Sequence, residues 1–196
     1  MKGKDGRAME LRFASAGDAA ELLDIYRQYI DTTITFEYDL PTLAEFTRRI
    51  ETISAEYPYL VCQADGALLG YAYAHRAFQR AAYQWCAELS VYLRPEARGR
   101  GLGPCLYRTL MDMLRLQGVR MAYGVVTSPN PRSEALHRAL GFTQAGFFHN
   151  SGYKAGAWRD VIWFEKPLLP FDTPQPFCGI DAIPRVKLDA LLKQYL

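Results

Sequence analysis

The chain has 196 residues, of which 49% are hydrophobic and 22% are charged, and its formal net charge is +2. This length fits one domain with a substantial core, and the composition is typical of a globular protein in water. So small a net charge gives no reason to expect a nucleic-acid or membrane partner, and no run approaches the roughly 18 apolar residues of a membrane helix.

The first part of the chain alternates strand and helix patterns. Residues 1–9 are charged and lack a signal-peptide core, so we expect a disordered lead-in. Asp65-Gly66 is a typical turn of a β-hairpin. The expected elements, in chain order, are a strand over 10–14, a helix over 18–30, an ordered loop over 32–39, a helix from Pro41-Thr42 to about residue 57, and strands over 59–64 and 67–75.

A glycine-rich loop follows at the centre of the chain, between a predicted strand over 87–93 and a predicted helix over 104–116. Strand, glycine-rich loop and helix can hold a phosphate, because small residues allow close backbone approach and the first helical N–H groups point at the anion. The loop lacks the Lys-Ser or Lys-Thr of a Walker A loop and the G-x-G-x-x-G spacing of a dinucleotide site. What remains is Arg98-x-x-Gly101-x-Gly103, for which the alternative is an ordinary glycine-rich turn.

The rest of the chain continues the alternation of strand and helix patterns up to about residue 165 and then becomes rich in proline. A strand over 120–126, a helix over 130–140, and strands over 142–148 and 157–165 are expected, with Gly152 and Gly156 in the loop between the last two. Four prolines between 167 and 176 indicate an extended linker. A helix over 185–196 is too short to be stable alone, so it should pack on the domain or on a second subunit, and the latter predicts a homodimer.

Two motifs and the order of the elements resemble those of the GNAT N-acetyltransferases. The loop Arg98-x-x-Gly101-x-Gly103 is similar to the family's R/Q-x-x-G-x-G/A, and the helix motif Asn130-x-x-Ser133-x-x-Leu136-His137-x-x-Leu140-Gly141-Phe142 to its N-x-x-A-x-x-L-Y-x-x-L-G-F. The likeness covers about 10–168 and leaves 169–196 as an extension with a short helix. It implies an α/β (α+β) fold with a mixed, mostly antiparallel sheet flanked by helices.

Within that family the sequence looks most like the phosphinothricin acetyltransferases and their methionine sulfoximine-acetylating relatives. The likeness rests on residues 57–61, 80–88 and 152–161. It implies an enzyme that moves an acetyl group from acetyl-coenzyme A to the amine of a small amino acid or analogue. The alternatives are a different small amine as acceptor, such as a polyamine, an aminoglycoside or an arylalkylamine, and a non-catalytic acyl-coenzyme A-binding module.

Two residues are candidates for proton transfer. A substrate amine is largely protonated at neutral pH and must lose a proton before it attacks. Strand alternation places Glu88 on one face with Ser90 and Tyr92, and its position matches the family's general base; the alternative is a solvent-facing carboxylate. His137 stands where many relatives have a tyrosine that protonates the departing thiolate, and the alternative is a partly buried helix histidine that only orients its neighbours.

The resemblance also implies a set of binding residues. Acetyl-coenzyme A is expected to contact the strand backbone, the glycine-rich loop and the next helix; these residues are Val91, Tyr92, Leu93, Arg98, Gly99, Arg100, Gly101, Leu102, Gly103, Asn130 and Ser133. An arginine suits the acceptor's carboxylate because its planar fork binds both oxygens. The acceptor residues expected are Arg76, Arg80, Tyr83 and Phe36. Each of the four could equally be a solvated arginine or a core aromatic.

No metal and no disulfide are expected. The four cysteines, Cys62, Cys86, Cys105 and Cys178, form neither a C-x-x-C pair nor a metal-ligand spacing. We therefore expect reduced thiols in a cytoplasmic protein whose partner is a small-molecule amine.

Overall fold

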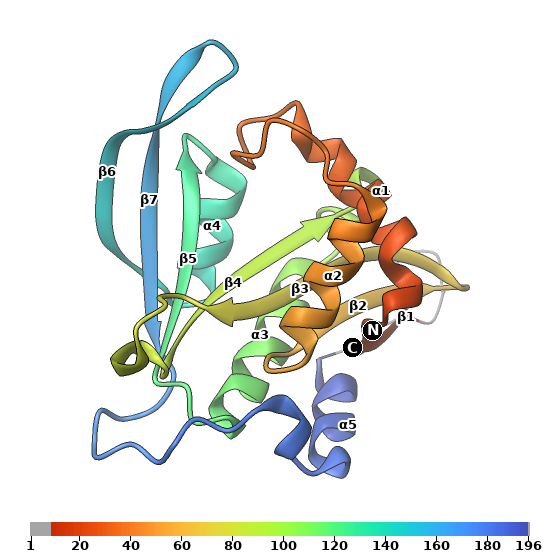
Figure 1. Cartoon of the computed structure of the whole chain (residues 1–196), viewed down its shortest axis with the longest axis vertical. Helices are drawn as coiled ribbons and strands as arrows, with labels where there is room; N and C mark the ends of the chain where they lie inside the picture. The colour runs from red at the N-terminus through yellow and green to blue at the C-terminus, as the bar shows by residue number, and fades with distance from the viewer. Residues whose placement is uncertain (1–8, 196) are drawn as a thin grey trace.

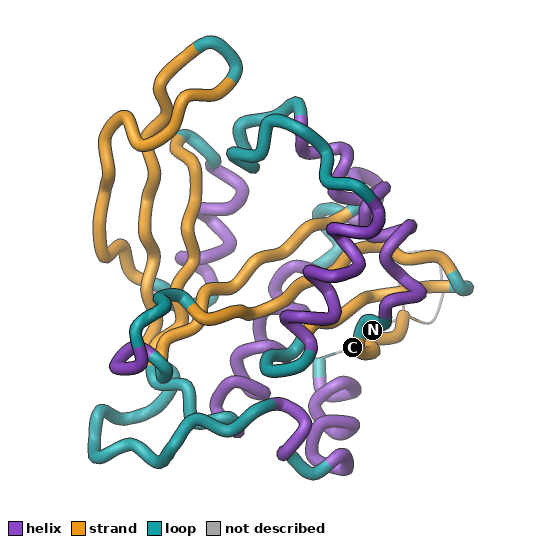
Figure 2. Tube along the Cα trace, in the orientation of Figure 1, coloured by secondary structure: helices purple, strands orange, loops and turns teal. Residues whose placement is uncertain are grey.

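The computed structural model describes residues 9–195 (Figures 1 and 2), so the predicted lead-in lies outside the described residues except for Met9, which begins the first strand. One mixed sheet has the strand order β1-β2-β3-β4-β5-β7-β6, with β4 and β5 parallel and every other neighbouring pair antiparallel. The strands are β1 (Met9–Phe13), β2 (Tyr59–Ala64), β3 (Ala67–Arg76), β4 (Cys86–Leu93), β5 (Met121–Ser128), β6 (Thr143–Lys154) and β7 (Ala157–Pro167).

Helices cover both faces of this sheet (Figure 1). The helices are α1 (Ala19–Ile30), α2 (Leu43–Ser54), α3 (Leu102–Leu116), α4 (Pro131–Ala139) and α5 (Arg185–Gln194). Strand alternation divides the buried side chains between two cores. Tyr59 and Val61 of β2 pack with α1 and α2 on one face, whereas Leu60 and Cys62 pack with α3 and α5 on the other. The predicted fold class is confirmed.

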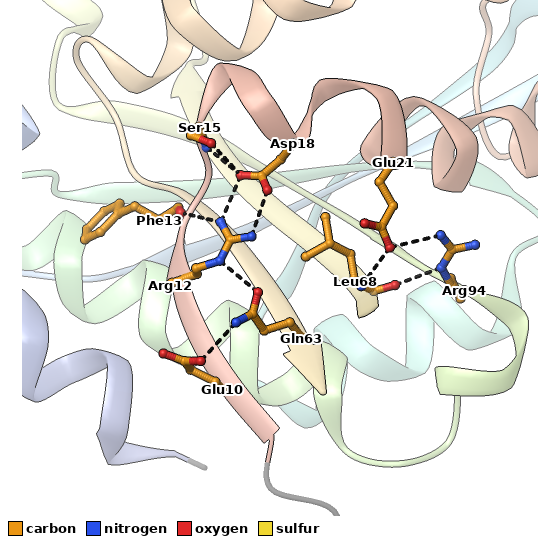
Figure 3. Close-up of polar contacts among 9 residues, drawn as sticks. All are labelled: Glu10, Arg12, Phe13, Ser15, Asp18, Glu21, Gln63, Leu68 and Arg94. Atoms are coloured by element: carbon orange, nitrogen blue, oxygen red, sulfur yellow. Dashed lines mark hydrogen bonds and ion pairs between the residues drawn. The ribbon is translucent and has the colours of Figure 1, made fainter. Parts of the chain in front are cut away.

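A polar network fixes the start of α1 against strands β1, β2 and β3 (Figure 3). The Arg12 guanidinium donates to both carboxylate oxygens of Asp18, at 2.7 and 2.8 Å, and this contact lowers the pKa of Asp18 to about 2. Glu21 accepts from the Leu68 amide at 2.8 Å and pairs with Arg94, which donates to the Leu68 carbonyl at 2.7 Å. Arg94 follows β4 directly, so the network also anchors the end of this strand, four residues before Arg98.

The strand pair β6–β7 differs from the sequence expectation. The predicted loop with Gly152 and Gly156 is wrong for Gly152, which lies inside β6 and pairs with Arg159. Only Ala155 and Gly156 form the turn, and both have positive φ, as a two-residue hairpin turn requires. Polar, exposed residues over 149–151 and a register shift between Phe148 and Gly152 hid the strand from its apolar pattern.

The segment after β7 packs on the domain. Phe177 lies over Tyr57 with ring centroids 5.1 Å apart, and the Trp85 indole donates to the Gln175 carbonyl at 2.8 Å. In α5, Leu188 and Leu192 are buried in the core that α3 forms with the sheet. This contact confirms the first of the two expected packing partners, the domain itself.

Candidate active site

The parallel strands β4 and β5 separate part-way along their length (Figure 1). Their pairing has three positions and ends with Glu88 opposite Tyr123, although β4 continues to Leu93. Hydrogen bonds from Arg94 to Leu69 and from Ala77 to Cys86 show that the even-numbered residues of β4 bond to β3. The odd-numbered residues therefore turn their backbone groups toward the gap beside β5.

Of the three strand residues expected at the cofactor, Val91 presents its backbone most directly. Its N–H and C=O face the gap beyond the last β4–β5 pair. Tyr92 bonds to β3, opposite Tyr71, and its ring lies among the aromatic side chains of α1. Both backbone groups of Leu93 contact the Tyr29 hydroxyl, which donates to the carbonyl at 2.5 Å and accepts from the amide at 2.9 Å.

The loop after β4 has the backbone that its glycines predict. Gly99 and Gly101 have φ of 73° and 80°, a region that side chains disfavour. Because Gly101 serves as the N-cap, α3 begins at Leu102, two residues earlier than expected. The N–H groups of the first turn, including those of Leu102 and Gly103, thus lie at the predicted phosphate-binding end of the helix.

Two further observations fit this loop to the diphosphate of acetyl-coenzyme A. The Arg98 guanidinium lies 5.2 Å from the centre of the Tyr29 ring, beside the backbone of Leu93, and Arg100 adds a second cation to the same loop. A Cβ at Gly103 would lie 3.6 Å from Leu136 of α4, so α3 and α4 approach each other closely here. Positive charge and a helix N-terminus therefore lie beside the end of β4, beyond the last position at which β4 pairs with β5.

Asn130 caps α4. Its side-chain oxygen accepts a hydrogen bond from the Ser133 amide at 3.2 Å, which is the N-cap geometry. The amide NH₂ of Asn130 remains available as a donor, so capping and cofactor contact are compatible. Ser133 lies on the same turn and is half-buried, and its carbonyl accepts from His137 Nδ1.

A cavity of about 210 Å³ lies on the α1–α2 face of the sheet, and Glu88 lines it. Its floor is formed by side chains of β2, β3 and β4, and its cover by α1, α2 and the loop between them. The lining residues are Tyr26, Thr35, Glu37, Phe46, Arg49, Ile53, Tyr59, Tyr71, Tyr73, His75, Glu88, Ser90 and Tyr92. The predicted alternation of Glu88, Ser90 and Tyr92 onto one face is confirmed.

Glu88 is a largely buried carboxylate beside a histidine. Burial raises the pKa of Glu88, and the nearby His75 opposes that shift. The shortest distance between Glu88 Oε1 and His75 Nε2 is 4.0 Å. A carboxylate with a raised pKa, at the edge of a cavity and next to the strand gap, has the properties of a general base.

His137 lies on the opposite face of the sheet and is only 2% exposed. Its ring stacks on Phe164, with centroids 5.0 Å apart, and fills the space that a Cβ on Gly124 would occupy. Nδ1 is 2.8 Å from the Ser133 carbonyl, which can only accept, so Nδ1 carries the proton and Nε2 faces the Tyr107 hydroxyl at 3.5 Å. This geometry favours the packing alternative for His137, since a neutral ring in this tautomer has no proton to donate from Nε2.

Burial of His137 makes protein stability depend on pH. Burial lowers the pKa of His137 below its ordinary 6.5, so the unfolded chain binds more protons between the two values. This contribution to stability is complete above the unfolded pKa and is lost as the pH falls through that window. We therefore expect His137→Phe to reduce the pH dependence of the free energy of unfolding between about pH 5 and 8.

Urea titrations across this range check the expectation, with His149→Gln as the control, since the His149 side chain is 76% exposed. The wild-type protein should lose up to about 1.4 kcal/mol per pH unit more than the Phe variant on the acid side. Parallel stability curves for wild type and His137→Phe would contradict the assignment.

The four residues expected at the acceptor do not gather in the cavity. Arg76 follows His75 on β3, so its side chain points to the other face, where it pairs with Glu56 at 3.9 Å. Arg80 is exposed, and Tyr83 packs on Phe78, whose ring also contacts Tyr123 next to Glu88. Tyr83 is therefore linked to a neighbour of the base through Phe78, and neither Tyr83 nor Arg80 lines the cavity.

Phe36 belongs to the loop between α1 and α2, which reaches the β6–β7 hairpin (Figures 1 and 2). Its ring lies against Gly152, where no Cβ would fit. The Tyr38 hydroxyl donates to the Tyr153 carbonyl, and Lys154 Nζ donates to the Glu37 carbonyl. Phe36 thus helps to hold this loop against the hairpin.

Sequence reasoning missed three ionisable side chains of the cavity besides its tyrosines: Glu37, Arg49 and His75. Arg49 lies on α2, one position before the buried Ile50, and its Nη1 donates to Glu37 at 2.6 Å. His75 lies opposite Glu88 in the β3–β4 register. The alternation of Tyr71, Tyr73 and His75 on one face could have found His75, but the helix pattern alone places Arg49 on a solvated face.

Comparison with known proteins supports the family resemblance of the sequence. The profile of the family described as "Acetyltransferase (GNAT) domain" matches residues 11–163. The chain belongs to the GNAT acetyltransferase family. This acetyltransferase is 36% identical to the phosphinothricin N-acetyltransferase of Streptomyces viridochromogenes, over 87% of this chain and 92% of that protein.

Two further relatives agree. The L-methionine sulfoximine/L-methionine sulfone acetyltransferase of Pseudomonas aeruginosa is 34% identical, over 82% of this chain and 95% of that protein. The crystal structure of a phosphinothricin acetyltransferase from Sinorhizobium meliloti in complex with AcCoA matches the acetyltransferase fold with a TM-score of 0.81 and 36% identity, and covers 88% of this chain and 98% of that one.

Two kinds of feature are absent from residues 9–195. Within this part of the chain, no helix is long and apolar enough to cross a membrane. The same residues contain no group of three or more His, Cys, Asp or Glu side chains arranged to hold a metal ion.

Proposed function

We propose that this acetyltransferase transfers an acetyl group from acetyl-coenzyme A to the α-amine of a small amino acid or analogue, of the phosphinothricin or methionine sulfoximine and sulfone type. The observation that carries the proposal is the position of Glu88. Its carboxylate lines a polar cavity at the point where β4 and β5 separate. In the sequence, Glu88 comes ten residues before Arg98, the first residue of the glycine-rich loop. The names of the relatives support this acceptor class.

The residues of the chain divide the work of the reaction. When bound, acetyl-coenzyme A supplies an activated acetyl thioester. Gly101, Gly103 and the first N–H groups of α3 hold its diphosphate, and the Val91 backbone orients its arm in the gap. Glu88 accepts the proton of the acceptor ammonium, directly or through one water, so that the neutral amine can attack the thioester carbonyl. As the C–N bond forms, the C–S bond breaks, and coenzyme A leaves as the thiol with the second proton of the amine.

Arg49 is the side chain placed to bind the acceptor's carboxylate. It lines the same cavity as Glu88, whereas Arg76 points to the other face and Arg80 is exposed. One guanidinium nitrogen donates to Glu37, and a guanidinium has five N–H donors, so others remain for an anion. The half-exposed position of Arg49 at the cover of the cavity leaves it accessible to a ligand.

An acceptor whose carboxylate is amidated should react poorly. Loss of a charge-assisted contact costs about 1.5–3 kcal/mol, so we expect KM to rise roughly 10- to 100-fold while the amine itself is unchanged. The measurement is thiol release from acetyl-coenzyme A with matched amino acids and their amides. Arg49→Ala should abolish most of this discrimination, and Arg80→Ala should keep it.

Other outcomes would redirect the proposal. If Arg80→Ala alone removes the discrimination, the carboxylate binds at the loop before β4. If amides, polyamines or aminoglycosides react as well as amino acids, the acceptor class is wrong and the acetyltransferase activity stands. The homodimer and the cytoplasmic location stay predictions, for which sedimentation and cell fractionation are the measurements.

A further inference from the structure

The histidine at position 75 lies directly opposite the proposed base and has no part in the mechanism above. The two side chains occupy paired positions of β3 and β4 and line the same cavity. Paired positions in an antiparallel sheet bring side chains of the same face together. The chain has three histidines, and the other two are buried on the opposite face of the sheet or exposed at the β6 edge.

The ring of His75 is fixed so that one nitrogen faces the carboxylate. Nδ1 lies 3.0 Å from the Arg76 carbonyl, which can only accept a hydrogen bond, so this contact assigns the proton to Nδ1. Nε2 then points toward Glu88, with a distance of 4.0 Å to Oε1. The His75 ring also packs against the Tyr73 ring, with centroids 5.9 Å apart, and this contact restricts rotation of the imidazole.

The other groups around Glu88 do not duplicate this role. Arg49 of α2 and Glu37 of the preceding loop form an ion pair at 2.6 Å and so largely neutralise each other. Ser90 is uncharged. The remaining titratable side chains that line the cavity are tyrosines, which are neutral near pH 7: Tyr26, Tyr59, Tyr71, Tyr73 and Tyr92. Tyr107 and Tyr123, which lie near Glu88 outside the cavity lining, are neutral as well.

We propose that His75 and Glu88 act as one proton-accepting pair, in which His75 keeps Glu88 ionised and passes its proton to solvent. This inference rests on the proposed function. In the step, an N–H bond of the acceptor ammonium breaks and its proton binds to the Glu88 carboxylate. The proton then moves to His75 Nε2, which leaves Glu88 ionised and the imidazole protonated, and water removes it from the partly exposed ring.

The pair offsets the effect of burial on Glu88, which favours the protonated form of the carboxyl group. Burial raises the pKa of Glu88, and a protonated carboxyl group cannot accept the proton of the amine. A neighbouring imidazolium favours the ionised carboxylate, since opposite charges a few ångströms apart attract in a partly buried site. A shift of about 1 Å in either side chain brings Nε2 and Oε1 to hydrogen-bond distance.

The first test needs no activity. The ring nitrogens of ¹⁵N-labelled histidines are titrated by NMR in the full-length wild type and in Glu88→Gln, with the exposed His149 as the internal control. We expect the midpoint of His75 to fall by at least about half a pH unit in the variant, and that of His149 to stay in place. Equal midpoints for His75 in the two proteins would overturn the pair.

The second test measures kcat/KM against pH for wild type, His75→Gln and His149→Gln. In His75→Gln, the fall of kcat/KM on the acid side of the profile (the acid limb) should begin at a higher pH than in the wild type. Above that limb, kcat/KM should recover toward the wild-type value. The KM for acetyl-coenzyme A should be unchanged. An acid limb that overlays the wild-type limb overturns the proposal. If no amine is acetylated at all, the proposed function fails, and the NMR titration still decides whether the two side chains are coupled.

Discussion

Glu88→Gln should lower kcat by a factor of about 10² to 10⁴ at neutral pH, the usual cost of removing a general base. The amide has nearly the same shape as the carboxylate, so the cavity keeps its volume, but it cannot accept the amine's proton. Affinity for acetyl-coenzyme A should be unchanged, because the gap beside Val91 and the glycine-rich loop do not use the Glu88 side chain. Steady-state rates and calorimetry measure the two quantities.

The pH dependence makes this expectation sharper. The loss should shrink as the pH rises, since a larger share of the acceptor amine is then already neutral. In the wild type, activity should fall on the acid side at a pH above the ordinary carboxyl range, because burial raises the pKa of Glu88. Glu10→Gln on the edge strand β1 is the control. A wild-type rate for Glu88→Gln at neutral pH would show that the carboxylate is structural.

The backbone elements that carry the site could be predicted from the sequence, because they depend on patterns among neighbouring residues. Glu88 could be placed because side chains alternate along a strand. The glycine-rich loop could be placed because its glycines precede an apolar helical pattern, although α3 begins two residues earlier than that pattern predicted. The turn Asp65-Gly66 has both residues at positive φ, as its type predicts. These features depend on a few neighbouring residues and need no knowledge of the packing.

The acceptor residues could not be predicted in the same way, because they depend on contacts between distant segments. Arg49 reaches the cavity because α2 packs over β3, and the pairing of His75 with Glu88 depends on the register of two strands. Arg76 carries the right chemistry but stands one position from His75, which turns it to the opposite face. For His137, the burial that favours packing comes from Tyr107, Phe142 and Phe164, which three other parts of the chain supply.

Gly101→Val should weaken binding of acetyl-coenzyme A about 5- to 150-fold. Gly101 has φ of 80° at the N-cap of α3, and a β-branched residue held there carries a strain of about 1–3 kcal/mol. The loop can relieve that strain only by changing the direction of the N–H groups that begin α3. If those groups bind the diphosphate as proposed, the strain appears as lost affinity, and about 1.4 kcal/mol corresponds to tenfold.

A second glycine separates loss of affinity from loss of stability. Gly66 has nearly the same φ, 81°, with no atom within 4 Å of an added Cβ, and it lies in the turn between β2 and β3. Gly66→Val therefore carries the same backbone strain away from the proposed cofactor site. Both variants should unfold at a lower temperature, but calorimetric titration should show weaker cofactor binding only for Gly101→Val. Equal affinities in the two folded variants would mean that the loop of Arg98 to Gly103 does not hold the diphosphate.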